Sequence, residues 1–425
     1  MTDTIFALSS GAPPAAIAVV RISGPLAGDA LRALAGRSLP PRRAVAATLR
    51  DQAGAVLDRV LALWLPGPTT ATGEDTAELH CHGGRAVVRA VEQALAALPG
   101  LRPAQPGEFT RRAFANGRID LSEAEGLADL LSAETELQRQ SALAMAGGDF
   151  SREVAGWRER LLMLSASVEA VLDFGDEDDV SDLPADFTAR LAGLEQELAT
   201  WLARPRAEAL REGYRVVLAG PPNAGKSTLF NALVESDAAI TAPVAGTTRD
   251  VLTHPVALGG VPFRFSDTAG LRDEAGDAIE AIGVERARSA LAQADLVLWL
   301  GAEGEGPDGA WEIEAQADRK DHPVKTAPRH RVSAVTGEGM DALRTDLIAH
   351  ARAALPRPGE AALNARQHRL LDEARAALAA ADGLSDALLV AESLRLARVA
   401  FDALLGRTTT EDMLDALFGR FCIGK

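Results

Sequence analysis

The chain has 425 residues, of which 47% are hydrophobic and 24% charged, a balance that excludes an intrinsically disordered protein. Its net charge of −16 argues against a protein that merely coats nucleic acid, because phosphate contacts need clustered Lys and Arg. No apolar run approaches the ~18 residues of a membrane span, and no secretory signal is evident. The two cysteines, Cys81 and Cys422, are far apart in sequence, so we expect a cytoplasmic protein without membrane attachment.

Residues 1–118 form the first predicted domain, an α+β unit. Strand-like runs occupy 17–20 and 60–65, and an Ala-rich helix is predicted over 84–98. This region holds 13 Arg and no Lys against 9 acidic residues, a net charge of +4, which leaves −20 for the rest. A local anionic ligand and an ordinary arginine-bearing surface explain that excess equally well.

Residues 119–210 and 356–425 are predicted to be two parts of one helical domain. Ser122 and Glu125 fit a capping box at its start. In the first part, apolar residues recur at helical spacing at Leu161, Leu164, Val168 and Leu172. The sequence between the two parts has a different hydrophobic pattern, so the simplest organisation is one domain inserted into another.

The inserted domain, residues 211–355, has the pattern of an α/β fold. Short apolar strands are predicted at 216–219, 263–266 and 296–300, and a helix over 227–234. Their spacing is that of a parallel sheet with crossover helices. The predicted fold class is therefore multidomain, with an N-terminal α+β domain, an all-α domain and an inserted P-loop α/β domain.

A complete phosphate-binding motif, G-x-x-x-x-G-K-[ST], runs from Gly220 to Ser227 between the first predicted strand and helix of this domain. Gly220 and Gly225 allow the backbone to curl so that successive N–H groups point at phosphate oxygens. Lys226 adds charge at the β- and γ-phosphates, which makes it a candidate catalytic residue, and Ser227 can bind Mg²⁺. A chance Gly-rich turn is the alternative. The predicted contacts in this loop are Asn223, Ala224, Gly225, Lys226, Ser227 and Thr228.

Three further segments follow in the order that a nucleotide switch needs. In the run Gly246 to Asp250, the hydroxyl of Thr247 or Thr248 can complete the Mg²⁺ shell. Each segment alone is a common turn, but in series behind a P-loop they indicate a GTPase. The second segment, in which the Asp can hold the metal through water and the Gly amide can meet the γ-phosphate, comprises Asp267, Thr268, Ala269 and Gly270. The third, which can contact guanine through its backbone, comprises Ser333, Ala334 and Val335.

Together with motifs near both chain ends, these segments resemble the tRNA modification GTPase family, called MnmE or TrmE. The match covers nearly the whole chain. The matching runs outside the GTPase motifs are 3–5, 20–25, 73–75, 78–84, 106–110, 112–121 and the terminal FCIGK at 421–425. Many families share a P-loop, but this combination of ends is specific.

The resemblance implies a potassium-dependent GTPase that, with a flavin-dependent partner protein, modifies C5 of the wobble uridine in certain tRNAs. A tetrahydrofolate derivative, 5-formyl- or methylene-tetrahydrofolate, supplies the one-carbon unit. The N-terminal domain is implied to bind the folate and to form a homodimer, which joins the partner in a heterotetramer. Whether tRNA contacts this chain directly is left open.

Carried over by motif, the folate site comprises Arg21, Glu78, Arg118 and Lys425. The three cations suit glutamate carboxylates, and Glu78 can accept hydrogen bonds from a pterin. Without the family, plain surface arginines are the simpler interpretation of Arg21 and Arg118. Cys422 is the candidate functional thiol, and His80-Cys81-His82 is not expected to bind a metal, because alternate strand residues face opposite ways.

The family is also similar in using K⁺ where other GTPases use an arginine finger. The implied ligands are the Asn223 side chain and backbone carbonyls near Ala242 and Val244. Glu280 is implied to orient the attacking water, with Glu274 or Asp277 as alternatives because the loop is longer than usual. The implied nucleotide-facing run before the first switch motif comprises Ala242, Pro243, Val244, Ala245, Gly246, Thr247 and Thr248.

The guanine-reading motif N-K-x-D is absent. Ala315 and Gln316 stand where Asn and Lys belong, and only Asp318 remains to accept the N1 and N2 hydrogens of guanine. Losing the Asn contact should weaken discrimination by ~1–3 kcal/mol. The connection 301–309 is also short and Gly-rich, which predicts a trimmed or irregular sheet edge. Two alternatives follow: a folate-binding dimeric scaffold with an impaired G domain, and a generic P-loop ATPase.

Overall fold

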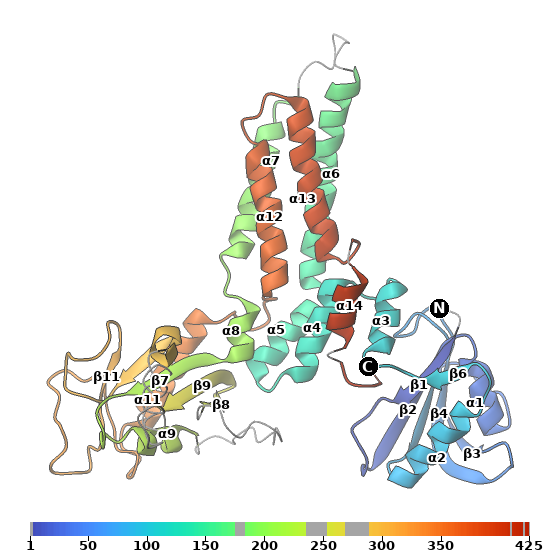
Figure 1. Cartoon of the computed structure of the whole chain (residues 1–425), viewed down its shortest axis with the longest axis horizontal. Coiled ribbons are helices and arrows are strands. Elements are labelled where there is room, and N and C mark those ends of the chain that lie inside the picture. Colours follow the sequence, from blue (N-terminus) through green and yellow to red (C-terminus); the bar gives the residue numbers. More distant parts are fainter. Residues whose placement is uncertain are drawn as a thin grey trace, which may run out of the picture. The chain divides into compact units, whose positions relative to one another are not determined.

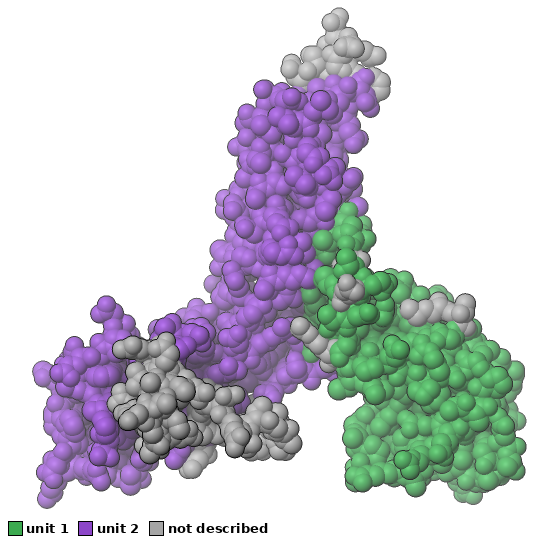
Figure 2. Space-filling model, in the orientation of Figure 1, with its two compact units in different colours: residues 1–128, 402–425 green, residues 129–401 purple. Residues whose placement is uncertain are grey.

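The structure is a computed structural model that describes residues 3–174, 183–234, 253–267, 289–408, 410–419 and 421–424. The chain divides into two compact units, one of Met1–Ala128 with Asp402–Lys425 and one of Asp129–Phe401 (Figure 2). Among the described residues, every helix is too short or too polar to cross a lipid bilayer. The predicted domain limits at 118, 210 and 355 stay predictions.

The first unit is built on a six-stranded sheet in the order β3-β4-β5-β2-β1-β6. Its elements are β1 (Thr4–Leu8), β2 (Ile17–Ser23), α1 (Ala27–Ala35), β3 (Ala44–Arg50), β4 (Val56–Leu65), β5 (Thr76–His82), α2 (Arg85–Ala96), β6 (Leu101–Pro103) and α3 (Glu108–Ala115). Neighbouring strands are antiparallel except β1 and β6. Alternate strand residues such as Phe6, Val20 and Leu79 form a core with Leu31 and Leu95, so α1 and α2 cover one face of the sheet (Figure 1).

The C-terminal segment completes this unit. It contributes α14 (Glu411–Phe418), and α4 (Leu121–Ser132) follows α3. Leu414 and Phe418 of α14, with Phe421, are buried in one cluster with Leu121 and Ala124 of α4. Residues nearly 300 positions apart in sequence thus share one small core.

The capping box predicted for α4 is wrong by two residues. The cap is formed by Asp120, whose Oδ1 accepts a hydrogen bond from the Glu123 amide at 2.9 Å, while Glu123 Oε2 accepts from the Asp120 amide at 2.7 Å. Ser122 lies inside the first turn, and its hydroxyl donates to the carbonyl of Leu404 at 3.0 Å. The sequence has a capping-box spacing both at Asp120 and Glu123 and at Ser122 and Glu125. Ser122 is buried in the structure, and the pair Asp120 and Glu123 forms the cap.

The second unit contains a bundle of helices. The bundle is formed by α6 (Asp149–Phe174), α7 (Phe187–Leu202), α12 (Ala365–Ala381) and α13 (Ala387–Leu404). Two shorter helices, α5 (Glu136–Ala146) and α8 (Ala207–Glu212), contribute residues to the core of the sheet in this unit. Four aromatic rings from α6, α7 and α13 pack together: Phe150, Trp157, Trp201 and Phe401. Their centroids lie 5.2–6.2 Å apart, the range in which tilted and edge-to-face pairs are favourable.

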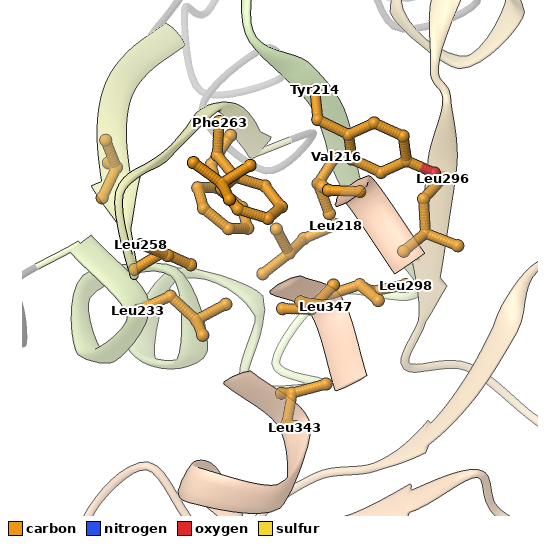
Figure 3. Close-up of a cluster of buried hydrophobic side chains, with 14 of the residues drawn as sticks. Tyr214, Val216, Leu218, Leu233, Leu258, Phe263, Leu296, Leu298, Leu343 and Leu347 are labelled. Atoms are coloured by element: carbon orange, nitrogen blue, oxygen red, sulfur yellow. The ribbon is translucent and has the colours of Figure 1, made fainter. Parts of the chain in front are cut away.

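The same unit contains a second six-stranded sheet, in the order β12-β11-β10-β7-β9-β8. Its elements are β7 (Tyr214–Ala219), α9 (Lys226–Val234), β8 (Thr253–Leu258), β9 (Val261–Asp267), β10 (Leu296–Trp299), β11 (Trp311–Glu314), β12 (His330–Arg331) and α11 (Met340–Ala354). All pairs are parallel except β8 with β9. Val216 and Leu218 of the central strand β7 pack with Phe263, Leu298 and Leu347 (Figure 3). The P-loop follows directly from this buried strand.

The connection from β10 to β11 confirms the expected irregular sheet edge. Residues 300–310 join two neighbouring parallel strands and contain no helix. The indole of Trp299 lies against this connection, and its Nε1 donates to the carbonyl of Ala302 at 2.8 Å. A Cβ on Gly301 would lie 2.4 Å from this ring, so the close approach requires glycine there.

Candidate functional site

The P-loop lies between β7 and α9, at the carboxyl end of the central strand. Positive φ values occur at Gly220 (+148°), Asn223 (+63°) and Gly225 (+90°), so the loop needs glycine or asparagine at these positions. Lys226 begins α9 and is buried; its Nζ donates to the carbonyls of Gly220 at 3.0 Å and Pro221 at 2.7 Å. The ammonium group is thus held against the loop that would surround a phosphate.

A cavity of about 120 Å³ lies beside this loop, and the predicted base-reading residues meet there. Its lining includes Gly225 and Thr228 from the P-loop side, and Asp318, Ala334 and Val335 from the opposite side. The structure therefore brings residues far apart in sequence to one cavity, as a base-binding pocket requires. Ala315 also lines it, in the place where the family motif has an asparagine.

Asp318 is held in this cavity by Ser333. The Ser333 hydroxyl, which is buried, donates to Asp318 Oδ1 at 2.6 Å and accepts from the Thr336 amide at 3.1 Å. The hydrogen bond from Ser333 lowers the pKa of Asp318 below its ordinary value, so the carboxylate is ionised at neutral pH. An ionised carboxylate is the form that accepts hydrogen bonds from a base.

Gln316 has a contact that the sequence did not reveal. Its Nε2 donates to the backbone carbonyl of Asn223 at 3.1 Å, which ties the segment predicted to read the base to the P-loop. Gln316 adopts a φ of +59°, uncommon for a residue with a side chain. From the sequence alone, Gln316 is a departure from the N-K-x-D motif. Only the length and the amide group of its side chain could have indicated a bond to the P-loop.

Several predicted site residues lie outside the described residues: Ala242, Pro243, Val244, Ala245, Gly246, Thr247, Thr248, Thr268, Ala269, Gly270, Glu280 and Lys425, with the alternatives Glu274 and Asp277. The backbone of Asp267 is described and ends β9 in register with Leu218. Leu218 lies two residues before Gly220, so the strand end that carries Asp267 adjoins the P-loop.

The folate-site candidates Arg21 and Glu78 form a pair on the first sheet. They are register partners on β2 and β5, and Arg21 Nε donates to Glu78 Oε1 at 3.0 Å. Both side chains are partly exposed, at 24% and 19%. The Arg21 guanidinium lies 5.8 Å from the ring centroid of Phe109, and His80 Nε2 lies 3.4 Å from Glu78 Oε2. This group is on the sheet face opposite α1 and α2.

The end of the chain comes to the same region. Ile423 bridges Pro106, and the carbonyl of Cys422 accepts from the Gly107 amide at 3.5 Å. A Cβ on Gly424 would lie 2.0 Å from the Leu8 carbonyl oxygen, and Leu8 is the register partner of Val20, next to Arg21. The penultimate residues therefore lie against β1, the strand that pairs with the one that carries Arg21.

Arg118 and the two cysteines complete the predicted set. Arg118 is exposed, and its stem lies beside Gly73, where an added Cβ would approach Arg118 Cγ to 3.2 Å. Cys422 is exposed, whereas burial, with the charge of Asp58, raises the pKa of the Cys81 thiol to about 12. Cys81 is thus an inert thiol. No group of three or more His, Cys, Asp or Glu side chains within the described ranges is placed to hold a metal ion.

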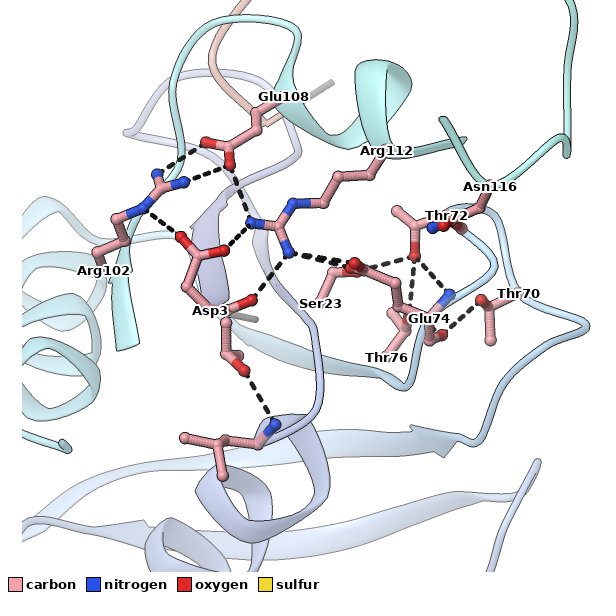
Figure 4. A network of polar contacts seen from close by, with 12 residues as sticks. Asp3, Ser23, Thr70, Thr72, Glu74, Thr76, Arg102, Glu108, Arg112 and Asn116 are labelled. Carbon is pink, nitrogen blue, oxygen red and sulfur yellow. Dashed lines mark hydrogen bonds and ion pairs between the residues drawn. The ribbon is translucent and has the colours of Figure 1, made fainter. Parts of the chain in front are cut away.

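Arg112 is the centre of a polar network that is not among the sequence-based predictions (Figure 4). Its guanidinium is fully buried and donates to Asp3 Oδ1 at 2.9 Å, to Glu108 Oε1 at 3.0 Å and to Glu74 Oε2 at 3.1 Å. Arg102 also binds Asp3 and Glu108, at 2.7 and 2.9 Å. Burial alone would raise the pKa of Glu108, but the hydrogen bonds from Arg102, the Gln105 amide and Arg112 outweigh it and lower that pKa. Several of the matching motif runs therefore hold the domain together.

Comparison with known proteins adds to this geometry. Two family models match the chain: "GTP-binding protein TrmE N-terminus" over residues 4–118 and "MnmE helical domain" over residues 121–422. The "tRNA modification GTPase MnmE" of Novosphingobium aromaticivorans is 67% identical, and that of Erythrobacter litoralis 64%, each with all of both chains covered.

Among solved structures, the G domain of the Thermotoga maritima FeoB iron transporter is 23% identical over 32% of this chain and 98% of its own, with a TM-score of 0.23. A score that low carries no argument about this chain. The family of the chain follows from the full-length relatives and the two family models. The chain belongs to the MnmE family of tRNA modification GTPases.

Proposed function

We propose that this chain hydrolyses GTP and acts in the modification of tRNA. The observation that carries the proposal is the cavity shared by the P-loop and Asp318, because one nucleotide can present its phosphates to the loop and its base to the carboxylate. The description of its full-length relatives as tRNA modification GTPases supports the tRNA step.

In this proposal the P-loop binds and orients the phosphates. Backbone amides of 220–227 and the N-terminus of α9 supply the donors. Lys226 exchanges its two carbonyl contacts for charge-assisted bonds to phosphate oxygens. Asp318 keeps Ser333 on Oδ1 and offers Oδ2 to guanine. Glu280 as the residue that orients water, and the runs 242–248 and 268–270, remain predictions.

The donor set of the loop fits two cations. Ser227 offers a hydroxyl in the first turn of α9, and Asn223 offers a side-chain carboxamide while Gln316 occupies its backbone carbonyl. Oxygen donors of this kind suit Mg²⁺ at Ser227 and K⁺ at Asn223. The bound cations would offset the negative charge that develops on the phosphoryl oxygens.

The N-terminal domain is proposed to bind a tetrahydrofolate derivative. Arg21, Glu78 and the terminal run around Cys422 adjoin on one side of the first sheet, where donors and acceptors for a glutamate tail and a pterin ring are both present. The homodimer and its heterotetramer with a flavin-dependent protein belong to the same proposal, with Cys422 as an exposed candidate thiol.

The test is the initial rate of GTP hydrolysis by the purified protein in KCl and in NaCl at equal ionic strength. We expect a clear rate in potassium, little in sodium, and loss of the rate in Lys226→Ala. The matched control is Lys320→Ala, which removes an exposed lysine of the same sheet domain. A Lys226→Ala protein that folds and retains the full rate would refute the proposal.

One observation favours a second candidate, a folate-binding scaffold whose G domain turns over slowly. Ala315 removes the carboxamide that would bind the base, although the cavity is formed. This candidate predicts that the protein binds 5-formyltetrahydrofolate, weakened by Arg21→Ala but not by Arg59→Ala on the same sheet, and hydrolyses no GTP in either salt. Normal GTP turnover would remove it.

A further inference from the structure

The loop between β11 and β12 carries Asp318 in a tight turn. The amide of Arg319 donates to the Gln316 carbonyl at 2.9 Å, which closes the turn over Ala317 and Asp318. The Ala317 amide donates to the Val332 carbonyl at 3.1 Å and fixes one side of it. The position of the Asp318 carboxylate therefore depends on how both ends of this turn are held.

His322 holds the far end. Its Nδ1 lies 2.6 Å from the Arg319 carbonyl oxygen and its Nε2 lies 2.8 Å from Glu314 Oε1, at the end of β11. A carbonyl oxygen only accepts, and so does an ionised carboxylate. Both ring nitrogens must therefore carry hydrogens, so the contacts select the imidazolium form. The His322 and Glu314 side chains are only 7% and 2% exposed.

Further charged groups surround this pair, and one of them, Arg331, opposes the imidazolium form because its charge lowers the pKa of His322. Glu314 Oε2 accepts from the Lys325 amide at 3.1 Å, and Arg331 Nε lies 3.1 Å from Glu314 Oε1. The Lys325 ammonium is bound to Glu312 and to the Trp299 carbonyl, and the turn itself adds Asp318 and Arg319.

The directions of the two pKa shifts agree with this geometry. Burial alone would raise the pKa of Glu314, but the bonds from His322 and the Lys325 amide lower it overall. The hydrogen bond to Glu314, then that to the Arg319 carbonyl, raises the pKa of His322. Glu314 is thus ionised, and His322 keeps its proton to a higher pH than an exposed histidine.

We propose that His322, in its protonated form, is a positioning residue for base recognition: by joining the Arg319 carbonyl to Glu314, it holds the turn that presents Asp318. The inference rests on the proposed guanine-nucleotide function and names its regulation. Neutral imidazole has one N–H and cannot make both contacts, so deprotonation releases one end of the turn. Guanine affinity then falls with rising pH, while the phosphate contacts of Lys226 stay as they are.

The test measures dissociation constants of GDP and ADP from pH 6 to pH 9, with wild type, His322→Gln and His330→Gln. His330, on β12, is the matched control, because its Nε2 lies 2.9 Å from Oδ2 of Asp346 in α11. We expect wild type and His330→Gln to bind GDP about fivefold more weakly at high pH, the value of one hydrogen bond. His322→Gln should bind GDP with the weaker affinity at every pH. The dissociation constant of ADP should change little with pH in all three proteins.

A wild-type GDP affinity that stays flat over this pH range would overturn the inference, as would a His322→Gln protein with the wild-type profile. In both cases GTP hydrolysis can still be normal, so the proposed function would survive. Failure to bind any guanine nucleotide would overturn both. If His322→Gln does not fold, the ring resonances of His322 in the wild type decide: an NMR titration midpoint at or below that of free histidine refutes it.

Discussion

The Nε2 of Gln316 donates to the backbone carbonyl of Asn223 across 3.1 Å, and the Gln316 side chain lies against Gly225, where an added Cβ would approach its Cγ to 3.1 Å. The segment predicted to read the base is therefore joined to the loop predicted to hold the phosphates. The residue that joins them is one that departs from the family motif. It supplies a donor of similar reach to the expected lysine, without the charge.

Gln316→Ala should weaken GDP binding about fivefold, since it removes one hydrogen bond between the two halves of the site. Gln316→Lys keeps a donor at the same position and should bind GDP as the wild type does. Isothermal titration measures both, with Gln293→Ala, an exposed glutamine of the same domain, as the control. Equal weakening in the alanine and lysine variants would show that the bond to Asn223 contributes nothing.

Ala315→Asn should increase the preference for GDP over ADP by about tenfold. The substitution places a carboxamide in the cavity, and a base contact of that kind is worth ~1–3 kcal/mol. The ratio of the two dissociation constants is the readout. Ala327→Asn, at an exposed position of the following loop, should leave the ratio unchanged. No change in Ala315→Asn would mean that the base does not approach this side of the cavity.

Arg112→Met should destabilise the first unit by about 3–5 kcal/mol, because three carboxylates lose the buried cation that they share. Arg111 provides a matched control one residue away: it pairs with Glu411 and Asp415 at the surface, so Arg111→Met should cost less than about 1 kcal/mol. Urea unfolding of both variants gives the comparison. Similar midpoints would contradict the central role of Arg112.

Acid should destabilise the same network. The pKa of Glu108 is lowered from an ordinary 4.5 and that of Asp3 from 3.8 in the folded protein. Groups with depressed folded pKa values contribute stability that is complete above the unfolded pKa and disappears as the pH falls through the folded value. The free energy of unfolding should therefore decline below about pH 4.5, and Glu108→Gln should flatten that decline. An equally steep decline in Glu108→Gln would assign it to other carboxylates.

Much of the fold follows from local pattern. The leucine and valine repeat in α6 is buried at Leu161, Leu164 and Val168, because helical spacing fixes which side faces the bundle, although Leu172 is 39% exposed near the end of α6. The P-loop and its strand were equally visible, since glycine positions follow directly from backbone geometry. Such features depend on neighbours along the chain.

The polar contacts did not follow, because some join distant segments and others, such as His322 with Glu314, depend on the path that a loop takes. Nothing in the sequence relates Arg112 to Asp3, or His322 to Glu314, since any charged residue has many possible partners. In the sequence, Gln316 was only a mismatch to N-K-x-D. A motif gives the usual residue at a position, but it does not say which contacts a different side chain makes there. The folate-site residues were predicted from the resemblance to the family. Without that resemblance, they would be interpreted as ordinary surface charges.

The shared core of Leu121 and Ala124 with Leu414, Phe418 and Phe421 has a consequence for synthesis of the protein. At ~5–20 residues per second, the ribosome needs on the order of tens of seconds to make the stretch from 129 to 401 after the N-terminal sheet has emerged. During that interval the apolar side of α4 has no partner from α14. The N-terminal unit is therefore completed only when translation is nearly finished, and until then this exposed surface is a natural target for chaperones.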